Sequence, residues 1–91
     1  MTPPPPCYDG GMIKLTVHAK ERQAKYGLAQ AWIETAVLQP DWTAPDPGHP
    51  DVTRSFKAIA ARGGKVLRVA HRADGADVLV LSAFFDRGAK P

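Results

Sequence analysis

The 91 residues suffice for one modest hydrophobic core and not for two, so the length predicts a single domain. The only cysteine, Cys7, excludes an internal disulfide and a cysteine-built zinc site, and it favours a reducing, cytoplasmic location. The net charge of +3 is mild. No export signal and no apolar run near the roughly 20 residues of a membrane span are present, so we expect no membrane partner.

The charge is unevenly distributed along the chain. Residues 1–53 carry a net charge of −2, whereas residues 54–91 carry +5. A basic half suggests a surface that meets RNA phosphates or an acidic protein partner. The same Lys and Arg content is also typical of an ordinary solvated surface, so charge alone does not choose between the two interpretations.

The chain opens with a tail that we expect to be disordered. Residues 3–6 are prolines, which cannot donate backbone hydrogen bonds, and Gly10 and Gly11 follow them. We therefore divide the chain into a tail at residues 1–11, one domain at residues 12–88 and a short C-terminal tail at residues 89–91.

The first part of the domain predicts two helices. Residues 12–17 alternate polar and apolar side chains, which indicates a short strand or an extended lead-in. Thr16 is the expected N-cap of a helix that runs to Tyr26, and Gly27 with Leu28 predicts a Schellman-type end. A second helix is expected over residues 29–39, because its apolar residues form one stripe and Pro40 stops it.

The second part predicts a loop and a three-stranded meander. Residues 41–51 contain Pro45, Pro47 and Pro50, which argue against a paired strand. Three apolar runs follow at residues 52–60, 65–72 and 77–85, and Asp74 with Gly75 predicts a type I′ hairpin turn between the last two. The sequence thus predicts an α+β fold: two N-terminal helices packed on an antiparallel sheet, with residues 12–17 as a possible fourth strand.

Candidate site residues occur on both the helices and the sheet. His18 and Arg22 are four residues apart and share one helix face, where an imidazole and a guanidinium suit phosphoryl chemistry, although an exposed polar face is the more usual reason for such spacing. His18, His49 and His71 lie on different elements, so we expect neither a metal site nor a cofactor.

The predicted sheet carries three further cations and a serine. Arg54 alternates with Lys57, which points to the opposite face, and Arg68 emerges on the open face if its apolar neighbours pack under the helices. Ser82 interrupts an apolar strand, where its hydroxyl must find a hydrogen bond or serve a function.

Several short motifs match one family in order along the chain. They are His18-Ala19-Lys20-Glu21-Arg22, Tyr26-Gly27-Leu28, residues 32–37, Gln39-Pro40-Asp41-Trp42, Arg54-Ser55-Phe56-Lys57, residues 65–69 and residues 78–85. Together they resemble the domain-of-unknown-function 4258 family, and they cover nearly everything except the tail. Members of this family are similar in plan to RelE-like toxins, with helices on one face of an antiparallel sheet and an RNA site on the other.

This resemblance implies a toxin-like, metal-independent ribonuclease in which the RNA's own 2′-OH attacks the adjacent phosphorus. It implies His18, Arg22 and Ser82 as catalytic residues and Arg54, Lys57 and Arg68 as phosphate-binding residues. It also implies RNA and a cognate antitoxin as partners of a monomer or homodimer. The alternative is a non-catalytic module that binds RNA or an acidic protein.

Overall fold

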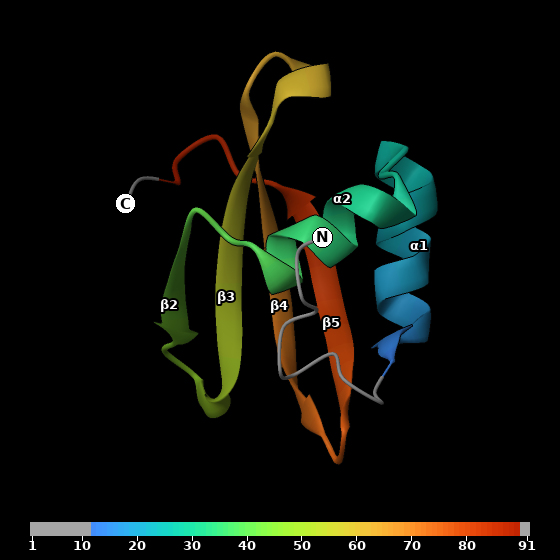
Figure 1. Cartoon of the computed structure of the whole chain (residues 1–91), viewed down its shortest axis with the longest axis vertical. Coiled ribbons are helices and arrows are strands. Elements are labelled where there is room, and N and C mark those ends of the chain that lie inside the picture. The colour runs from blue at the N-terminus through green and yellow to red at the C-terminus, as the bar shows by residue number, and fades with distance from the viewer. Residues whose placement is uncertain (1–11, 90–91) are drawn as a thin grey trace, which may run out of the picture.

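The structure is a computed structural model that describes residues 12–89, and the expected N-terminal tail lies outside the described residues. It is an α+β fold with two helices and a five-stranded mixed sheet (Figure 1). The strands are arranged in the order β1-β5-β4-β3-β2, with β1 parallel to β5 and every other pair antiparallel. The elements are β1 (Ile13–Leu15), α1 (Val17–Tyr26), α2 (Gln30–Leu38), β2 (Trp42–Asp46), β3 (His49–Ile59), the 3-10 turn η2 (Ala60–Arg62), β4 (Lys65–Asp74) and β5 (Asp77–Phe85).

The predicted boundaries of α1 are confirmed. Thr16 caps its start, because the Thr16 hydroxyl accepts a hydrogen bond of 3.1 Å from the amide of Ala19. Gly27 adopts a left-handed conformation with φ of 62° at its end, and the amide of Leu28 bonds the carbonyl of Gln23 at 2.9 Å. The helix is therefore fixed at both ends by local chemistry that the sequence displays.

The expected additional strand is present at residues 13–15, but its parallel pairing makes the sheet mixed rather than antiparallel as predicted. Residues 13–15 pair in parallel with residues 78–80, on the free side of β5. After Leu15 the chain leaves the sheet and continues as α1, which runs beside β5 (Figure 1). Because β1 and α1 follow each other along the same edge of the sheet, the start of α1 lies beside the middle of β5.

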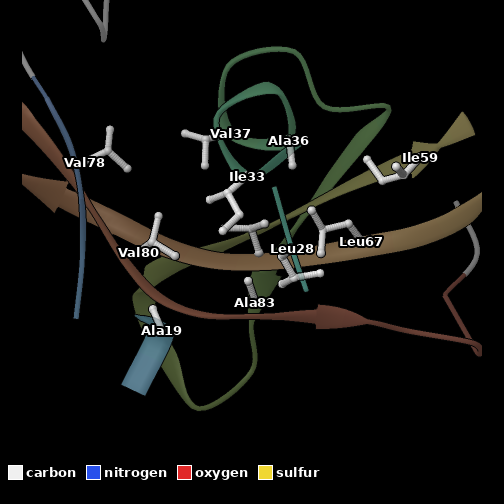
Figure 2. Packing of buried hydrophobic residues seen from close by; sticks show 11 residues of the cluster. Ala19, Leu28, Ile33, Ala36, Val37, Ile59, Leu67, Val78, Val80 and Ala83 are labelled. Carbon is white, nitrogen blue, oxygen red and sulfur yellow. The ribbon is translucent and has the colours of Figure 1, made fainter. Parts of the chain in front are cut away.

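The hydrophobic core lies between one face of the sheet and the helices (Figure 2). Ile33 and Ala36 of α2 are fully buried there against Leu67 of β4, as the apolar stripe predicts. Ala19 of α1 is likewise fully buried. We call this the helix face of the sheet, and the opposite one, which neither helix covers, the open face. The buried cluster consists of Ala19, Leu28, Ile33, Ala36, Val37, Ile59, Leu67, Val69, Val78, Val80 and Ala83.

A β-bulge in β5 changes which residues point into this core. Ala70 pairs with Ser82 but the next residue of β4, His71, pairs with Val80, so Leu81 is the extra residue. Val80 is fully buried before the bulge and Ala83 is fully buried after it. The residues of β5 that point into the core are therefore even-numbered before the bulge and odd-numbered after it.

The expectation of a loop over residues 41–51 is wrong. Residues 42–46 form β2, which pairs with β3, and β3 itself begins at His49 rather than near Val52. β2 is the edge strand of the sheet, and an edge strand tolerates a proline because one row of its backbone groups has no ladder partner. Pro45 also sits where the register shifts, next to Asp46.

The expected type I′ turn between β4 and β5 is wrong in detail. Asp74 pairs with Asp77, so the two central residues are Gly75 and Ala76, not Asp74 and Gly75. Gly75 has φ of 63°, and among the described residues only glycines have positive φ. One positive φ at the first central position is the pattern of a type II′ turn, which suits the twist of a hairpin equally well.

Arg62 joins the end of α1 to the rest of the fold. Its Nη2 donates to the carbonyls of Tyr26 and Gly27 at 3.4 and 3.2 Å. Its guanidinium lies 5.3 Å from the ring centre of Trp32 and 5.8 Å from that of Phe85. The carbonyls at the helix end, which have no partner within α1, are thereby satisfied by a cation.

We expect Gly27→Ala to destabilise the fold more than Gly63→Ala. Both glycines adopt the left-handed conformation, with φ and ψ of 62° and 40° at Gly27 and of 67° and 25° at Gly63, so each substitution costs about 1–2 kcal/mol in the backbone. An added Cβ at Gly27 lies 3.1 Å from Nη2 of Arg62, whereas one at Gly63 meets nothing within 4 Å. Only the first variant therefore also disturbs the Arg62 hydrogen bonds, for about 1 kcal/mol more. Urea denaturation measures both losses, and equal losses would contradict the role given to Arg62.

Candidate nucleic-acid interface

Two of the predicted phosphate-binding residues share the open face. Arg68 pairs with Phe84 of β5 and with Phe56 of β3, while its neighbours Leu67 and Val69 are fully buried under the helices. Arg54 pairs with Ala70. Because paired residues point to the same side of a sheet, the side chains of Arg54 and Arg68 project on the side away from α2.

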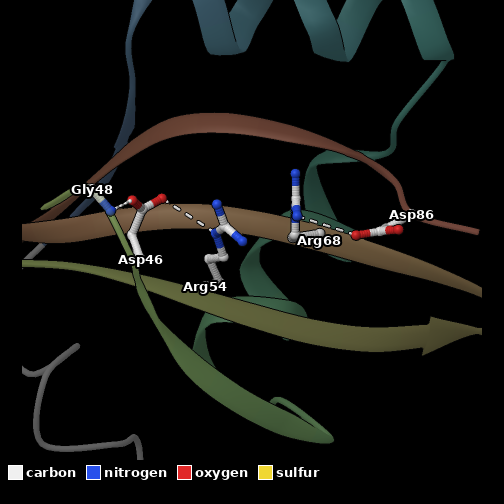
Figure 3. A network of polar contacts seen from close by, with 5 residues as sticks. All are labelled: Asp46, Gly48, Arg54, Arg68 and Asp86. Carbon is white, nitrogen blue, oxygen red and sulfur yellow. Dashed lines mark hydrogen bonds and ion pairs between the residues drawn. The ribbon is translucent and has the colours of Figure 1, made fainter. Parts of the chain in front are cut away.

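Each of these arginines is held by a carboxylate (Figure 3). Nε of Arg54 lies 3.2 Å from Oδ2 of Asp46, and Nη1 of Arg68 lies 3.2 Å from Oδ2 of Asp86. The amide of Gly48, together with Arg54, lowers the pKa of Asp46 below its ordinary value, so Asp46 stays charged. The open face therefore presents cations that are already paired within the chain.

Aromatic rings share the open face with the two arginines, and one of them contacts Arg68. The Arg68 guanidinium lies 4.3 Å from the ring centre of Phe84, a close cation–π contact. Trp42 of β2 stacks on Phe56 of β3, with ring centres 4.9 Å apart and an interplanar angle of 8°. Trp42 thus belongs to the sheet, and the Trp42–Phe56 pair together with Phe84 places aromatic rings on the same face as the two arginines.

Lys57 does not share this face. It pairs with Leu67, so it points to the helix face, as the strand alternation predicts. Its ammonium lies 3.2 Å from Oδ1 of Asp41, whose Oδ2 accepts from the amide of Ala58 at 2.8 Å. That amide first, and Lys57 second, lower the pKa of Asp41. Lys57 and Asp41 therefore attach the segment after α2 to β3.

The two predicted helix residues do come together. Nε of Arg22 donates to Nε2 of His18 at 3.4 Å, and Nη1 of Arg22 donates to the hydroxyl of Tyr26 at 3.2 Å. His18, Arg22 and Tyr26 form one row along α1, which we call the helix row. Tyr26 was not among the predicted site residues, although its spacing of four from Arg22 was the available signal.

The helix row runs along the flank of α1 that is nearest to the end of the open face. Tyr26 lines a cavity with Phe84 and Asp86, the two residues that contact Arg68. The opposite flank of α1 carries Lys20 and Gln23, which line a shallow depression with residues 13–15. Within residues 12–89 no hydrogen bond or ion pair joins the helix row to Arg54, Lys57 or Arg68.

Ser82 also lies on the open face. It pairs with Ala70, directly after the bulge at Leu81, and it is half-buried. The bulge is fixed by Thr16, whose hydroxyl donates to the carbonyl of Leu81 at 3.2 Å. Without the bulge, strand alternation would turn Ser82 to the helix face, so Thr16 and Leu81 together determine where its hydroxyl lies.

A second polar pair lies on the helix face, apart from this interface. Oγ of Ser55 is 2.7 Å from Nε2 of His71, and Ser55 is only 1% exposed. Burial of the imidazole lowers the pKa of His71 below its ordinary value of 6.5. With its hydroxyl enclosed, Ser55 satisfies a half-buried histidine rather than meeting a ligand.

The comparisons with known proteins add no relative: the chain matches no protein-family model, no curated protein and no solved structure. Neither α1 nor α2 has the length and apolar composition that crossing a bilayer requires. Residues 12–89 contain no group of three or more His, Cys, Asp or Glu side chains placed to hold a metal ion. Functional interpretation therefore depends on the residues and the geometry described above.

The His71 pair predicts that the protein loses stability in mild acid. Because the folded state lowers the pKa of His71, protonation favours the unfolded chain. The stabilisation is fully present above the unfolded value of about 6.5 and is lost as the pH falls through the folded-state pKa. We expect His71→Gln, which keeps a polar partner for Ser55, to flatten this dependence of the free energy of unfolding, measured by urea denaturation between pH 8 and pH 5. The control variant His18→Gln, at an exposed histidine, should keep the same pH dependence of the free energy of unfolding as the original protein. An unchanged slope in His71→Gln would contradict the role given to His71.

Proposed function

We propose that this protein binds single-stranded RNA on the open face of its sheet. The observation that carries the proposal is the gathering of Arg54, Arg68 and the partly exposed rings of Trp42 and Phe84 on the one face that the helices leave uncovered. Phe56 is buried there and supports the ring of Trp42. Guanidinium groups bind phosphates, and aromatic side chains stack on unpaired bases of any sequence. Unpaired RNA offers both groups, whereas a duplex hides its bases.

The resemblance to RelE-like toxins supports the same face. In that plan the helices pack on one face of the sheet and RNA binds the other, and the open face here is the corresponding surface. We extend the proposal accordingly to a cytoplasmic, toxin-like protein. A cognate antitoxin with an acidic segment would compete with RNA for Arg54 and Arg68.

The carboxylate partners give the proposed interface a particular energetics. Asp46 and Asp86 each hold one arginine at 3.2 Å. RNA must exchange these contacts for contacts with phosphate, so part of the gain in binding is offset by the broken pairs. We therefore expect a weaker affinity than the number of arginines suggests, together with a clear dependence on salt.

We expect Arg54→Gln and Arg68→Gln each to weaken RNA binding. Fluorescence anisotropy of a labelled single-stranded oligonucleotide, measured over a range of salt concentrations, gives the affinity and its salt dependence. Loss of one phosphate contact should reduce the slope of log K against log salt by about 0.7. The matched control is Lys57→Gln, which removes the same charge from the helix face and should leave the slope unchanged.

The converse substitution sharpens this test. Asp46→Asn releases Arg54 on the open face, whereas Asp41→Asn releases Lys57 on the helix face, and both raise the net charge by one. We expect tighter RNA binding only for Asp46→Asn. Equal effects of the two variants would mean that net charge, not the open face, determines binding.

The helix row favours a second candidate function, RNA cleavage without a metal. His18 would take the proton of a 2′-OH, whose oxygen attacks the adjacent phosphorus. The bond from phosphorus to the 5′-oxygen then breaks, the 5′-oxygen takes a proton from water, and a 2′,3′-cyclic phosphate remains. Arg22, hydrogen-bonded to His18 at 3.4 Å, would stabilise the added negative charge on phosphorus. In the structure Arg22 donates to Nε2 of His18, so the RNA must displace this contact before that nitrogen can act as a base.

For this candidate we expect His18→Ala to abolish cleavage of single-stranded RNA while leaving its affinity nearly unchanged. Loss of a general base lowers a rate by about 10²–10⁴-fold. Gel electrophoresis of a labelled oligonucleotide measures the rate, and relief of growth arrest on expression provides a second readout. The control is His49→Ala, an exposed histidine outside the helix row. Cleavage at the same rate in His18→Ala would remove His18 from the mechanism.

A further inference from the structure

A cavity of about 590 Å³ lies at the end of the sheet, where α1 ends, β4 begins and β5 ends. Its volume falls within the range of small-molecule sites. Its aromatic and charged lining includes Tyr26, Lys65, Phe84, Phe85, Asp86 and Arg87. None of the six site residues predicted from the sequence lines this cavity.

Three aromatic rings contribute walls from two elements. Tyr26 comes from the end of α1 and remains 37% exposed, while Phe84 and Phe85 are adjacent in β5. Adjacent strand residues point to opposite faces, so both line one cavity only because it wraps around the end of the sheet. Phe84 belongs to the open face, and its ring contacts the Arg68 guanidinium. The cavity is therefore continuous with the proposed RNA interface.

The cavity also carries positive charge that the fold does not use. Lys65 and Arg87 are exposed, and within residues 12–89 neither takes part in an ion pair. The lining carboxylate, Asp86, is already engaged, because Oδ2 faces Arg68 at 3.2 Å and Oδ1 accepts from the amide of Gly88 at 3.0 Å. An anion in the cavity therefore meets two available cations and a carboxylate that is already paired.

Backbone amides are not the anion-binding groups here. The amides of Gly63 and Gly64, beside the cavity, bond the carbonyls of Ala60 and Ile59 at 3.1 and 3.0 Å. The third lining cation, Arg62, is committed to the end of α1 and to two rings. The chemistry left for a ligand is therefore aromatic surface together with the side-chain cations Lys65 and Arg87.

We propose that this cavity binds one unstacked nucleotide of the RNA, with its base against Tyr26 and Phe84 and its phosphate at Lys65 and Arg87. The inference rests on the proposed function and adds to it a specific subsite. A nucleotide combines one flat ring system with one phosphate, which is the pair of features that the walls and the charges offer. A strand that crosses Arg54 and Arg68 reaches the cavity at Phe84.

The first test uses a free nucleotide and so does not depend on the open face. Adenosine 5′-monophosphate is titrated into the full-length protein, and the amide signals are followed by NMR. We expect the amide signals of Gly63, Gly64, Lys65 and Arg87 to shift. Adenosine and ribose 5-phosphate should each bind at least roughly fivefold more weakly than the nucleotide. Lys65→Gln and Arg87→Gln should each weaken binding roughly fivefold, while Lys20→Gln, on the opposite flank of α1, should have no effect. Retained signal dispersion shows that the variants fold.

The second test uses RNA with one base removed. An oligonucleotide with a single abasic position should bind roughly tenfold more weakly when that position reaches the cavity, and Phe84→Leu should remove this difference. RNA binding that depends on Arg54 and Arg68 but not on Lys65 or Arg87, with no nucleotide shifts, overturns the cavity inference and leaves the proposed function standing. Nucleotide binding at the cavity without RNA binding overturns the proposed function and leaves the cavity as a nucleotide site. Shifts with an acidic peptide and none with the nucleotide overturn the inference as well.

Discussion

The hydrogen bonds of Thr16 determine where the helix row lies relative to the sheet. The amide of Thr16 bonds the carbonyl of Val80 at 3.0 Å, and its hydroxyl bonds the carbonyl of Leu81 while also capping α1. One residue thus ends β1, starts α1 and holds the bulge of β5. Because α1 continues along the edge that β1 began, the helix row and Ser82 come to the same margin of the sheet from distant parts of the chain.

The chain has a net charge of only +3, and the cations of the proposed binding face are balanced within the fold. Each of the three predicted phosphate-binding cations has an aspartate within 3.2 Å. Such pairs add little to stability when partly exposed, but they hold the arginine side chains in fixed positions. The open face is therefore ordered before a ligand arrives, and RNA must replace each carboxylate with a phosphodiester of the same charge.

The elements predicted correctly from the sequence are those that depend on residues close together in the chain. The caps of α1, the apolar stripe of α2 and the existence of the β4–β5 hairpin were readable because each depends on residues close in sequence. β2 was missed because its prolines are typical of a loop, and only its place at the sheet edge makes Pro45 acceptable. The face of Arg68 followed from alternation with Leu67 and Val69, whereas its partner Asp86 depends on how two strands end, which no short-range pattern encodes. The roles assigned to His18, Arg22 and Ser82 remain predictions.

The outer strands bear on self-association. β1 contributes only three residues, and β2, at the other margin, contains a proline that lacks an amide hydrogen. Short or proline-containing edges are poor templates for another strand, so neither margin readily extends the sheet into a second copy. The long central strands β4 and β5 each lie between two neighbouring strands, which keeps the most apolar segments of this small chain away from the edges of the sheet.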